Sequence, residues 1–206
     1  MQRSLPPGWQ APRLQGAHVG LEALAPEHLQ GLQQALHGDA LARLWYTNVP
    51  TAADAETWLG NALDKHAQGI EVPFVVRDAD GRVAGSTRFY DLEPSVPRLS
   101  IGYTWYAPRV QRTGLNTEAK LLLLTHAFET LGCAAVYLET SWFNQASRTA
   151  IARLGARQEG VLRNHRRHAD GSLRDTVVFS IIDNEWRGVK HNLQYRLQQG
   201  DQSHGQ

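Results

Sequence analysis

A mixed α+β fold, with helices packed against a central sheet, is predicted from the order of hydrophobic patterns along the chain. That order is strand, two helices, three strands, helix, strand, helix, two strands and helix. Tight turns at Asp80-Gly81 and Asp170-Gly171 each join two strands, and such turns link antiparallel neighbours. The strand–helix–strand unit over residues 98–141 predicts instead a right-handed crossover between two parallel neighbours.

The first third of the chain predicts one strand and two helices. The strand is the segment 17–24. The first helix, 25–38, has Pro26 in its first turn, where the missing N–H of proline removes no helical hydrogen bond. The second helix, 54–69, is expected to end at Gly69, because glycine is favoured just past a helix end.

The rest of the chain alternates between strands and helices. Asn144 can cap a helix start with its side-chain oxygen, and Gly155 can end the same helix. The remaining elements are a hairpin at 72–92, a strand at 98–108, a helix at 115–131, a strand at 133–141, a helix at 144–155, a hairpin at 160–182 and a helix at 184–199.

A single domain is expected, because 206 residues can form one sizeable core and no linker interrupts the chain. We assign this domain to residues 13–200. Residues 1–12 contain three prolines and are expected to form a flexible arm. Residues 201–206 are expected to form a flexible tail.

The charge balance and the single cysteine limit the function classes. A net charge of +1 gives no general attraction to nucleic acid or to an anionic membrane, so neither is expected as a partner. The run of four leucines, 121–124, is too short to span a bilayer, and the N-terminus lacks the apolar run of a signal peptide. Cys133 has no second cysteine to pair with, so a cytoplasmic protein is expected. His165 and His168 would point to opposite faces of a strand, so no metal site is expected.

The segment before the helix at 115–131 is typical of an anion-binding loop. Gln111, Gly114 and Asn116 lie directly before a run of leucines, and Gly114 permits the positive φ angle of a tight turn. The N–H groups at the helix start would face an anion at the positive end of the helix dipole. The P-loop pattern and the dinucleotide-binding glycine pattern are both absent from the sequence. An ordinary strand-to-helix turn explains this segment equally well on its own.

The loop resembles the acetyl-CoA pyrophosphate loop of the GNAT N-acetyltransferases, whose pattern is Gln/Arg-x-x-Gly-x-Gly/Ala. Asn116 occupies the last position, where glycine or alanine is usual. The segment GLNTEAKLLLLTHAFETLG is similar to the RimJ/RimL-like branch, in which Asn-x-Glu-x-Lys is common at this point. The segments HVGLEALAPEHL and NQASRTAIARLGARQEGVLRNHRRHADGSLRDTVVFSIIDNEW are similar to the same branch, so the resemblance covers residues 17–190.

This resemblance implies the GNAT fold, which is a mixed, mostly antiparallel sheet with helices on both faces, and the order of elements supplies about seven strands. The sheet would splay between the strands at 98–106 and 134–140. Acetyl-CoA would lie in that gap, with its pantetheine arm beside open backbone groups and its pyrophosphate on the N–H groups of 111–116. The implied cofactor-binding residues are Tyr106, Gln111, Arg112, Thr113, Gly114, Leu115, Asn116, Thr117, Asn144 and Ser147.

The resemblance also implies direct transfer of the acetyl group to a primary amine in a ternary complex. Ser147 would protonate the departing thiolate, because the tyrosine acid of many relatives falls at Ile151 here. The glutamate base of RimL-like enzymes aligns with Arg166, so that base is absent. The candidates for a replacement base are Glu139, which we assign as catalytic, Glu118, His165 and Asp175.

The acceptor would be a protein N-terminal α-amine or a small-molecule amine. The basic run 163–167 is either a solvated hairpin edge or a docking site for an acidic substrate or for the 3′-phosphate of the cofactor. The residues assigned to the acceptor site are Trp45, Tyr46, Trp105, Trp142 and His165.

Two further hypotheses remain open from the sequence. The missing tyrosine and glutamate leave room for a non-catalytic acyl-CoA-binding sensor of the same fold, which would bind the cofactor tightly without turnover. The aromatic face of the last helix could join two copies of the chain in a homodimer.

Overall fold

The computed structural model describes residues 5, 8–38, 41–168 and 170–203. Its sheet has eight strands in the order β1-β2-β3-β4-β5-β6-β8-β7. The strands are β1 (Leu14–Gln15), β2 (Val19–Ala23), β3 (Val72–Asp78), β4 (Val83–Glu93), β5 (Arg98–Tyr106), β6 (Ala135–Ser141), β7 (Arg157–Arg167) and β8 (Leu173–Ile182). The α-helices are α1 (Leu29–Ala35), α2 (Ala55–Ala67), α3 (Leu115–Thr125), α4 (Gln145–Leu154) and α5 (Asp183–Ser203).

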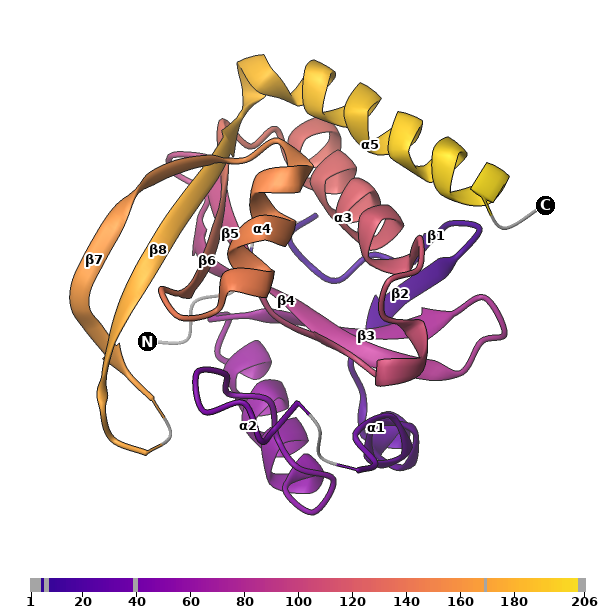
Figure 1. The fold of residues 1–206 in the computed structure, drawn as a ribbon, viewed down its shortest axis with the longest axis vertical. Helices are drawn as coiled ribbons and strands as arrows, with labels where there is room; N and C mark the ends of the chain where they lie inside the picture. The colour runs from indigo at the N-terminus through magenta and orange to yellow at the C-terminus, as the bar shows by residue number, and fades with distance from the viewer. Residues whose placement is uncertain (1–4, 6–7, 39–40, 169, 204–206) are drawn as a thin grey trace.

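The predicted mixed α+β architecture is confirmed. Helices α1 and α2 cover one face of the sheet, and α3, α4 and α5 lie over the other (Figure 1). All neighbouring strands are antiparallel except β5 and β6, which are parallel and joined through α3. The strand beyond the seven expected is β1, which is only two residues long.

Alternate residues of the central strands supply two cores, one on each face of the sheet. In β3, Phe74 and Val76 pack under α3, whereas Val75 packs with Leu32 of α1 and Leu59 of α2. This alternation follows from the two-residue period of a strand. Because both faces are covered by helices, β3 reads as an almost continuous apolar run rather than as alternating polar and apolar residues.

The two ends of the chain are partly described. Residues 1–4 and 6–7 of the predicted arm, and 204–206 of the predicted tail, lie outside the described residues. Trp9 is 8% exposed and packs in the core under α3, so the packed part of the chain begins before residue 13. Helix α5 continues to Ser203, past its expected end. No helix among the described residues is long and apolar enough to cross a membrane.

Glu118 joins the start of α3 to the turn between β1 and β2. Its carboxylate accepts the backbone N–H of Ala17 at 2.9 Å and of His18 at 2.6 Å, and the residue is buried. We expect Glu118→Ala, which removes both charge-assisted hydrogen bonds, to lower the free energy of unfolding in urea by about 2–4 kcal/mol. The control Glu56→Ala removes an exposed carboxylate from the first turn of α2 and should cost no more than about 0.5 kcal/mol. Equal losses in the two variants would contradict this role.

Candidate active site

The gap between β5 and β6 organises the site. These strands pair over only three residues each, 98–100 with 135–137. Farther along, β5 stays paired with β4 as far as Tyr106, and β6 stays paired with β8 as far as Ser141. The facing edges of β5 and β6 therefore diverge, and their backbone N–H and C=O groups do not pair with each other. This divergence confirms the splay expected between the two strands.

A cavity of about 530 Å³ lies in this gap, which we call the splay cavity. Its walls come from β5, β6, the starts of α3 and α4, the segment 41–49 and the β7–β8 hairpin. Three buried polar atoms of lining residues have no hydrogen-bond partner among the described residues: Trp105 Nε1, Tyr106 Oη and Arg174 Nε. A buried polar atom left unpaired costs roughly 1–3 kcal/mol, so these atoms suit a cavity that receives a polar ligand.

The loop before α3 has a left-handed residue, but not at the expected position. Arg112 has φ +63°, whereas Gly114 has φ −64° and is right-handed. The expectation that Gly114 supplies the positive φ is therefore wrong. The absence of a Cβ there gives room to a neighbour, because a Cβ would lie 3.1 Å from the ring of His18 and that ring would have to shift by a few tenths of an ångström. A left-handed arginine costs on the order of 1–3 kcal/mol, and such strain is concentrated at functional loops.

Backbone N–H groups remain open at the start of α3. The Thr113 hydroxyl donates to the Val110 carbonyl at 2.7 Å and accepts the N–H of Leu115 at 3.3 Å. Within the described part of the chain, no acceptor is found for the backbone N–H groups of residues 112–114. These donors lie at the positive end of the α3 dipole and are therefore suited to an anion such as a phosphate.

The cavity brings together six of the ten residues predicted to bind the cofactor. Those six are Tyr106, Gln111, Arg112, Asn116, Asn144 and Ser147. The other four belong to the loop and the first turn of α3 and do not line the cavity: Thr113, Gly114, Leu115 and Thr117. Leu115 is buried in the core because it faces the sheet, so its side chain is not available to a ligand.

The start of α4 places a hydroxyl at the cavity wall. The side-chain oxygen of Asn144 accepts the N–H of Ser147 at 3.0 Å, which is the N-cap expected from the sequence. Ser147 is half-buried and lines the cavity. Ile151, one turn later on the same face, also lines it and offers no proton.

Glu139 and Arg166 form an ion pair at the cavity wall. Arg166 Nη2 lies 3.0 Å from Glu139 Oε2, and the side chains are 37% and 14% exposed. Position 166, where RimL-like enzymes carry the glutamate base, therefore lies at the site. Its arginine contacts Glu139, the carboxylate expected to replace that base. The pair fixes the position of that carboxylate.

The other three candidates for the base do not line the cavity. Glu118 is bound to backbone N–H groups beside α3. Asp175 pairs with Arg163 at 2.6 Å. His165 is exposed on β7. Among the described residues, Glu139 is therefore the one that places a carboxylate at the cavity.

The residues predicted for the acceptor site divide into two groups. Tyr46 and Trp105 line the splay cavity, whereas Trp45, Trp142 and His165 do not. Trp45 packs against Phe143, with ring centroids 5.1 Å apart, and against His168 at 4.9 Å. Trp142 lies 42% exposed below the guanidinium of Arg148, at 4.2 Å. These contacts join the segment 41–49 to the tip of the β7–β8 hairpin beside the cavity.

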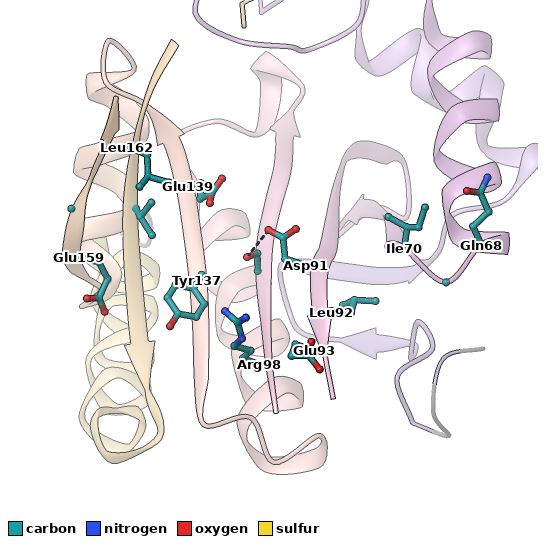
Figure 2. Close-up of a pocket in the computed structure, with 14 residues that line it drawn as sticks. Gln68, Ile70, Asp91, Leu92, Glu93, Arg98, Tyr137, Glu139, Glu159 and Leu162 are labelled. Atoms are coloured by element: carbon teal, nitrogen blue, oxygen red, sulfur yellow. Dashed lines mark hydrogen bonds between the residues drawn. The ribbon is translucent and has the colours of Figure 1, made fainter. Parts of the chain in front are cut away.

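A second pocket of about 710 Å³ lies next to the first one, below the end of α2 (Figure 2). Its charged lining residues are mostly acidic, in contrast to those of the splay cavity, and Glu139 lines both. The charged residues of this second pocket are Asp91, Glu93, Arg98, Glu139 and Glu159. This pocket has no signature in the sequence, because its residues come from six separate segments.

Lys120 lines the splay cavity although it was not among the site residues predicted from the sequence. Its side chain is buried, and its Nζ donates to Thr104 Oγ1 at 3.0 Å. No carboxylate pairs with it among the described residues. Burial lowers the pKa of Lys120 to about 7. Its spacing was a usable signal, since Lys120 lies four residues from both Asn116 and Leu124 and so shares their helix face.

This lowered pKa makes stability depend on pH. Between about pH 7 and 10, Lys120 is mostly neutral in the folded chain and protonated in the unfolded chain, so the unfolded state binds more protons. The free energy of unfolding should therefore rise with pH there, by up to about 1.4 kcal/mol per pH unit. Lys120→Met should remove this rise, as measured by urea unfolding at several pH values, whereas Lys190→Met, at an exposed ion pair, should keep it. An unchanged pH profile in Lys120→Met would contradict the assignment.

The comparisons with known proteins agree with this geometry. The family model described as "Acetyltransferase (GNAT) domain" matches residues 18–157. The chain is 28% identical over 180 residues to "Putative ribosomal N-acetyltransferase YdaF" of Bacillus subtilis (strain 168), covering 84% of this chain and 96% of the relative.

Solved structures show the same fold. The crystal structure of a GCN5-related N-acetyltransferase from Brucella melitensis is 32% identical, with a TM-score of 0.83 over 93% of this chain and 87% of that one. Mycobacterium smegmatis RimJ in complex with CoA-disulfide is 21% identical, with a TM-score of 0.77 over 93% and 97% of the two chains. Together with the splayed strands and the loop before α3, these findings show that the chain belongs to the GNAT acetyltransferase family and is an acetyl-CoA-dependent enzyme.

Proposed function

We propose that the protein transfers the acetyl group of acetyl-CoA to a primary amine, by direct attack of the amine within a ternary complex. The observation that carries this proposal is the splay cavity, which has Ser147 at one wall and Glu139 at another. A hydroxyl can give a proton and a carboxylate can take one, and amine acetylation needs both transfers.

The surroundings of the gap suit acetyl-CoA. The diverging edges of β5 and β6 offer backbone groups to the amide-bearing pantetheine arm, as an added strand would use them. The open N–H groups of residues 112–114 and the charge of Arg112 suit the pyrophosphate. When bound, acetyl-CoA supplies an acetyl group on a thiol that leaves readily.

The residues around the gap favour direct attack over an acetylated enzyme. Cys133 is buried and does not line the cavity, and burial raises the pKa of its thiol to about 11. The thiol therefore stays protonated and poorly nucleophilic. Ser147 would donate its proton to the departing sulfur, and Glu139 would accept the proton of the amine, directly or through a water.

An α-amine fits this site better than a lysine side chain does. With a pKa of about 7.7–8.0, the α-amine at a peptide N-terminus is neutral in roughly 10–20% of molecules at pH 7, whereas a lysine amine is neutral in about 0.04%. The candidate base is already held by Arg166, so a substrate that needs little deprotonation suits the site.

The test is release of free thiol from acetyl-CoA with a panel of amines, together with calorimetric titration of acetyl-CoA. The panel contains free amino acids, short peptides with free N-termini, polyamines and aminoglycosides. Steady thiol release with one class, matched by acetylated product in mass spectrometry, would support the proposal. Tight binding of acetyl-CoA with no turnover on any amine would overturn it and favour the sensor hypothesis.

A further inference from the structure

The wall of the splay cavity that lies across from the cofactor loop has an excess of positive charge. Arg166 and Arg174 both line it, whereas Glu139 is the carboxylate found there among the described residues. The remaining cationic lining residues, Arg112 and Lys120, belong to the cofactor loop and to α3. Glu139 is paired with Arg166, so the charge of Arg174 is not balanced in the same way.

Arg174 is the less satisfied of the two arginines. It lies opposite Arg166 in the β7–β8 ladder, so two guanidinium groups start from neighbouring positions. Its Nε is buried without a hydrogen-bond partner, and no carboxylate of the described chain forms an ion pair with it. Burial, and then the positive charge of Arg166, lower the pKa of Arg174. The negative charge of Glu139 acts on Arg174 as well, but Glu139 is paired with Arg166, so two guanidinium groups share one described carboxylate.

An anionic group on the ligand would correct this imbalance. A guanidinium presents its N–H donors in a planar fork that matches the two oxygens of a carboxylate, and such charge-assisted pairs are among the strong hydrogen bonds of proteins. The neighbouring pocket is mostly acidic, with Asp91, Glu93, Glu139 and Glu159 around Arg98, so the positive charge of Arg166 and Arg174 belongs to the splay cavity and is not general along the sheet (Figure 2).

We propose that Arg174, supported by Arg166, binds a carboxylate carried by the amine acceptor, so that the acceptor is a small amine of the amino-acid or short-peptide type. This inference rests on the proposed amine acetylation and deepens it. Polyamines and aminoglycosides, which carry only positive charge, meet repulsion at the same wall. Arg174 is a substrate-binding residue in this scheme and takes no part in proton transfer.

The test compares acceptors that differ only in the carboxylate. Free α-amino acids are paired with their α-amides, and dipeptides are paired with the same dipeptides amidated at the C-terminus. We expect KM to be roughly 10- to 100-fold lower for each carboxylate form, as the loss of one charge-assisted pair implies. An amide neighbour makes the amine less basic and so more often neutral at pH 7, which means that a preference for the carboxylate form cannot come from reactivity alone. The two pairs distinguish a free amino acid from the end of a peptide.

Substitutions then locate the preference. Arg174→Met should raise KM for the carboxylate acceptor roughly 10- to 100-fold while kcat and the KM for the amide change little, and Arg174→Lys should restore part of the affinity because it keeps the charge without the fork. The matched control is Arg163→Met, at an exposed arginine on the same hairpin that does not line the cavity. Thermal unfolding of each variant shows whether the protein is folded.

The outcomes separate this inference from the proposed function. Amides and carboxylates used equally well, or an equal change of KM for both in Arg174→Met, would overturn the carboxylate site while leaving the acetyltransferase proposal intact. Faster turnover of polyamines than of any carboxylate acceptor would do the same. No turnover with any amine would instead count against the proposed function itself.

Discussion

Glu71→Ala is expected to produce the largest loss of stability of the substitutions considered, about 3–5 kcal/mol in free energy of unfolding. Glu71 Oε2 lies 2.6 Å from Arg88 Nη1, and each side chain is 4% exposed. Removing the carboxylate leaves a buried guanidinium without a counterion, and that penalty is much larger than the net contribution of an intact pair. Urea unfolding followed by circular dichroism measures the change.

The control for this prediction uses the other partner of the same carboxylate. Lys65 Nζ lies 3.0 Å from Glu71 Oε1, but the lysine is 43% exposed, so Lys65→Met should cost no more than about 1 kcal/mol. Replacing both Glu71 and Arg88 by apolar residues should cost less than Glu71→Ala alone, because no charge is then left unpaired. A loss below about 1 kcal/mol for Glu71→Ala would show that water reaches the guanidinium.

The Glu71–Arg88 pair also connects the core to the site. The Arg88 guanidinium lies 4.8 Å from the ring of Trp58 and 4.9 Å from that of Tyr103, and both aromatic residues line the splay cavity. Tyr103 has φ +51°, a conformation held by these surroundings. We therefore expect KM for the amine acceptor to be higher in Glu71→Ala than in Lys65→Met.

Much of the fold could be predicted because local signals and long-range packing agree. Gly81 and Gly171 have positive φ angles, which is the reason that the Asp-Gly pairs indicated hairpins. Asn144 caps α4 and Gly155 ends it with φ +104°, as their residue types indicated. In each case one residue has a conformational preference strong enough to determine the local backbone without help from distant parts of the chain.

The site was predictable only where a resemblance or a helix start marked it. Ion pairs such as Glu139 with Arg166, 27 residues apart, depend on how β6 lies relative to the β7–β8 hairpin, and no local pattern encodes that. Gly114 shows the same limit, because the side chain that a Cβ would crowd is His18, almost a hundred residues earlier in the chain. A motif can identify a residue of the site, but its structural role depends on neighbours that only the three-dimensional structure reveals.

Ser147→Ala is expected to have the largest effect on activity, lowering kcat roughly 100-fold with little change in the affinity for acetyl-CoA. Ser147 lines the cavity. The departing thiol has a pKa near that of cysteine, about 8.5, so its thiolate leaves readily and needs only one proton donor. The expected loss in kcat therefore lies at the lower end of the range for general acid catalysis. Stopped assays of thiol release give kcat, and calorimetry gives the affinity.

A matched control and a second substrate make this assignment specific. Thr149→Val also removes a hydroxyl from α4, but at an exposed position outside the cavity, and should leave kcat within about twofold of the unmodified protein. If Ser147 protonates the leaving sulfur, an acetyl thioester of a more acidic thiol should depend less on it, so the loss in Ser147→Ala should shrink with that donor. An equal loss with both donors would point to a positioning role for Ser147 instead. Full activity in Ser147→Ala would transfer the acid role to another hydroxyl of the cavity, and the buried, unpartnered Tyr106 Oη is the first to substitute, by Tyr106→Phe.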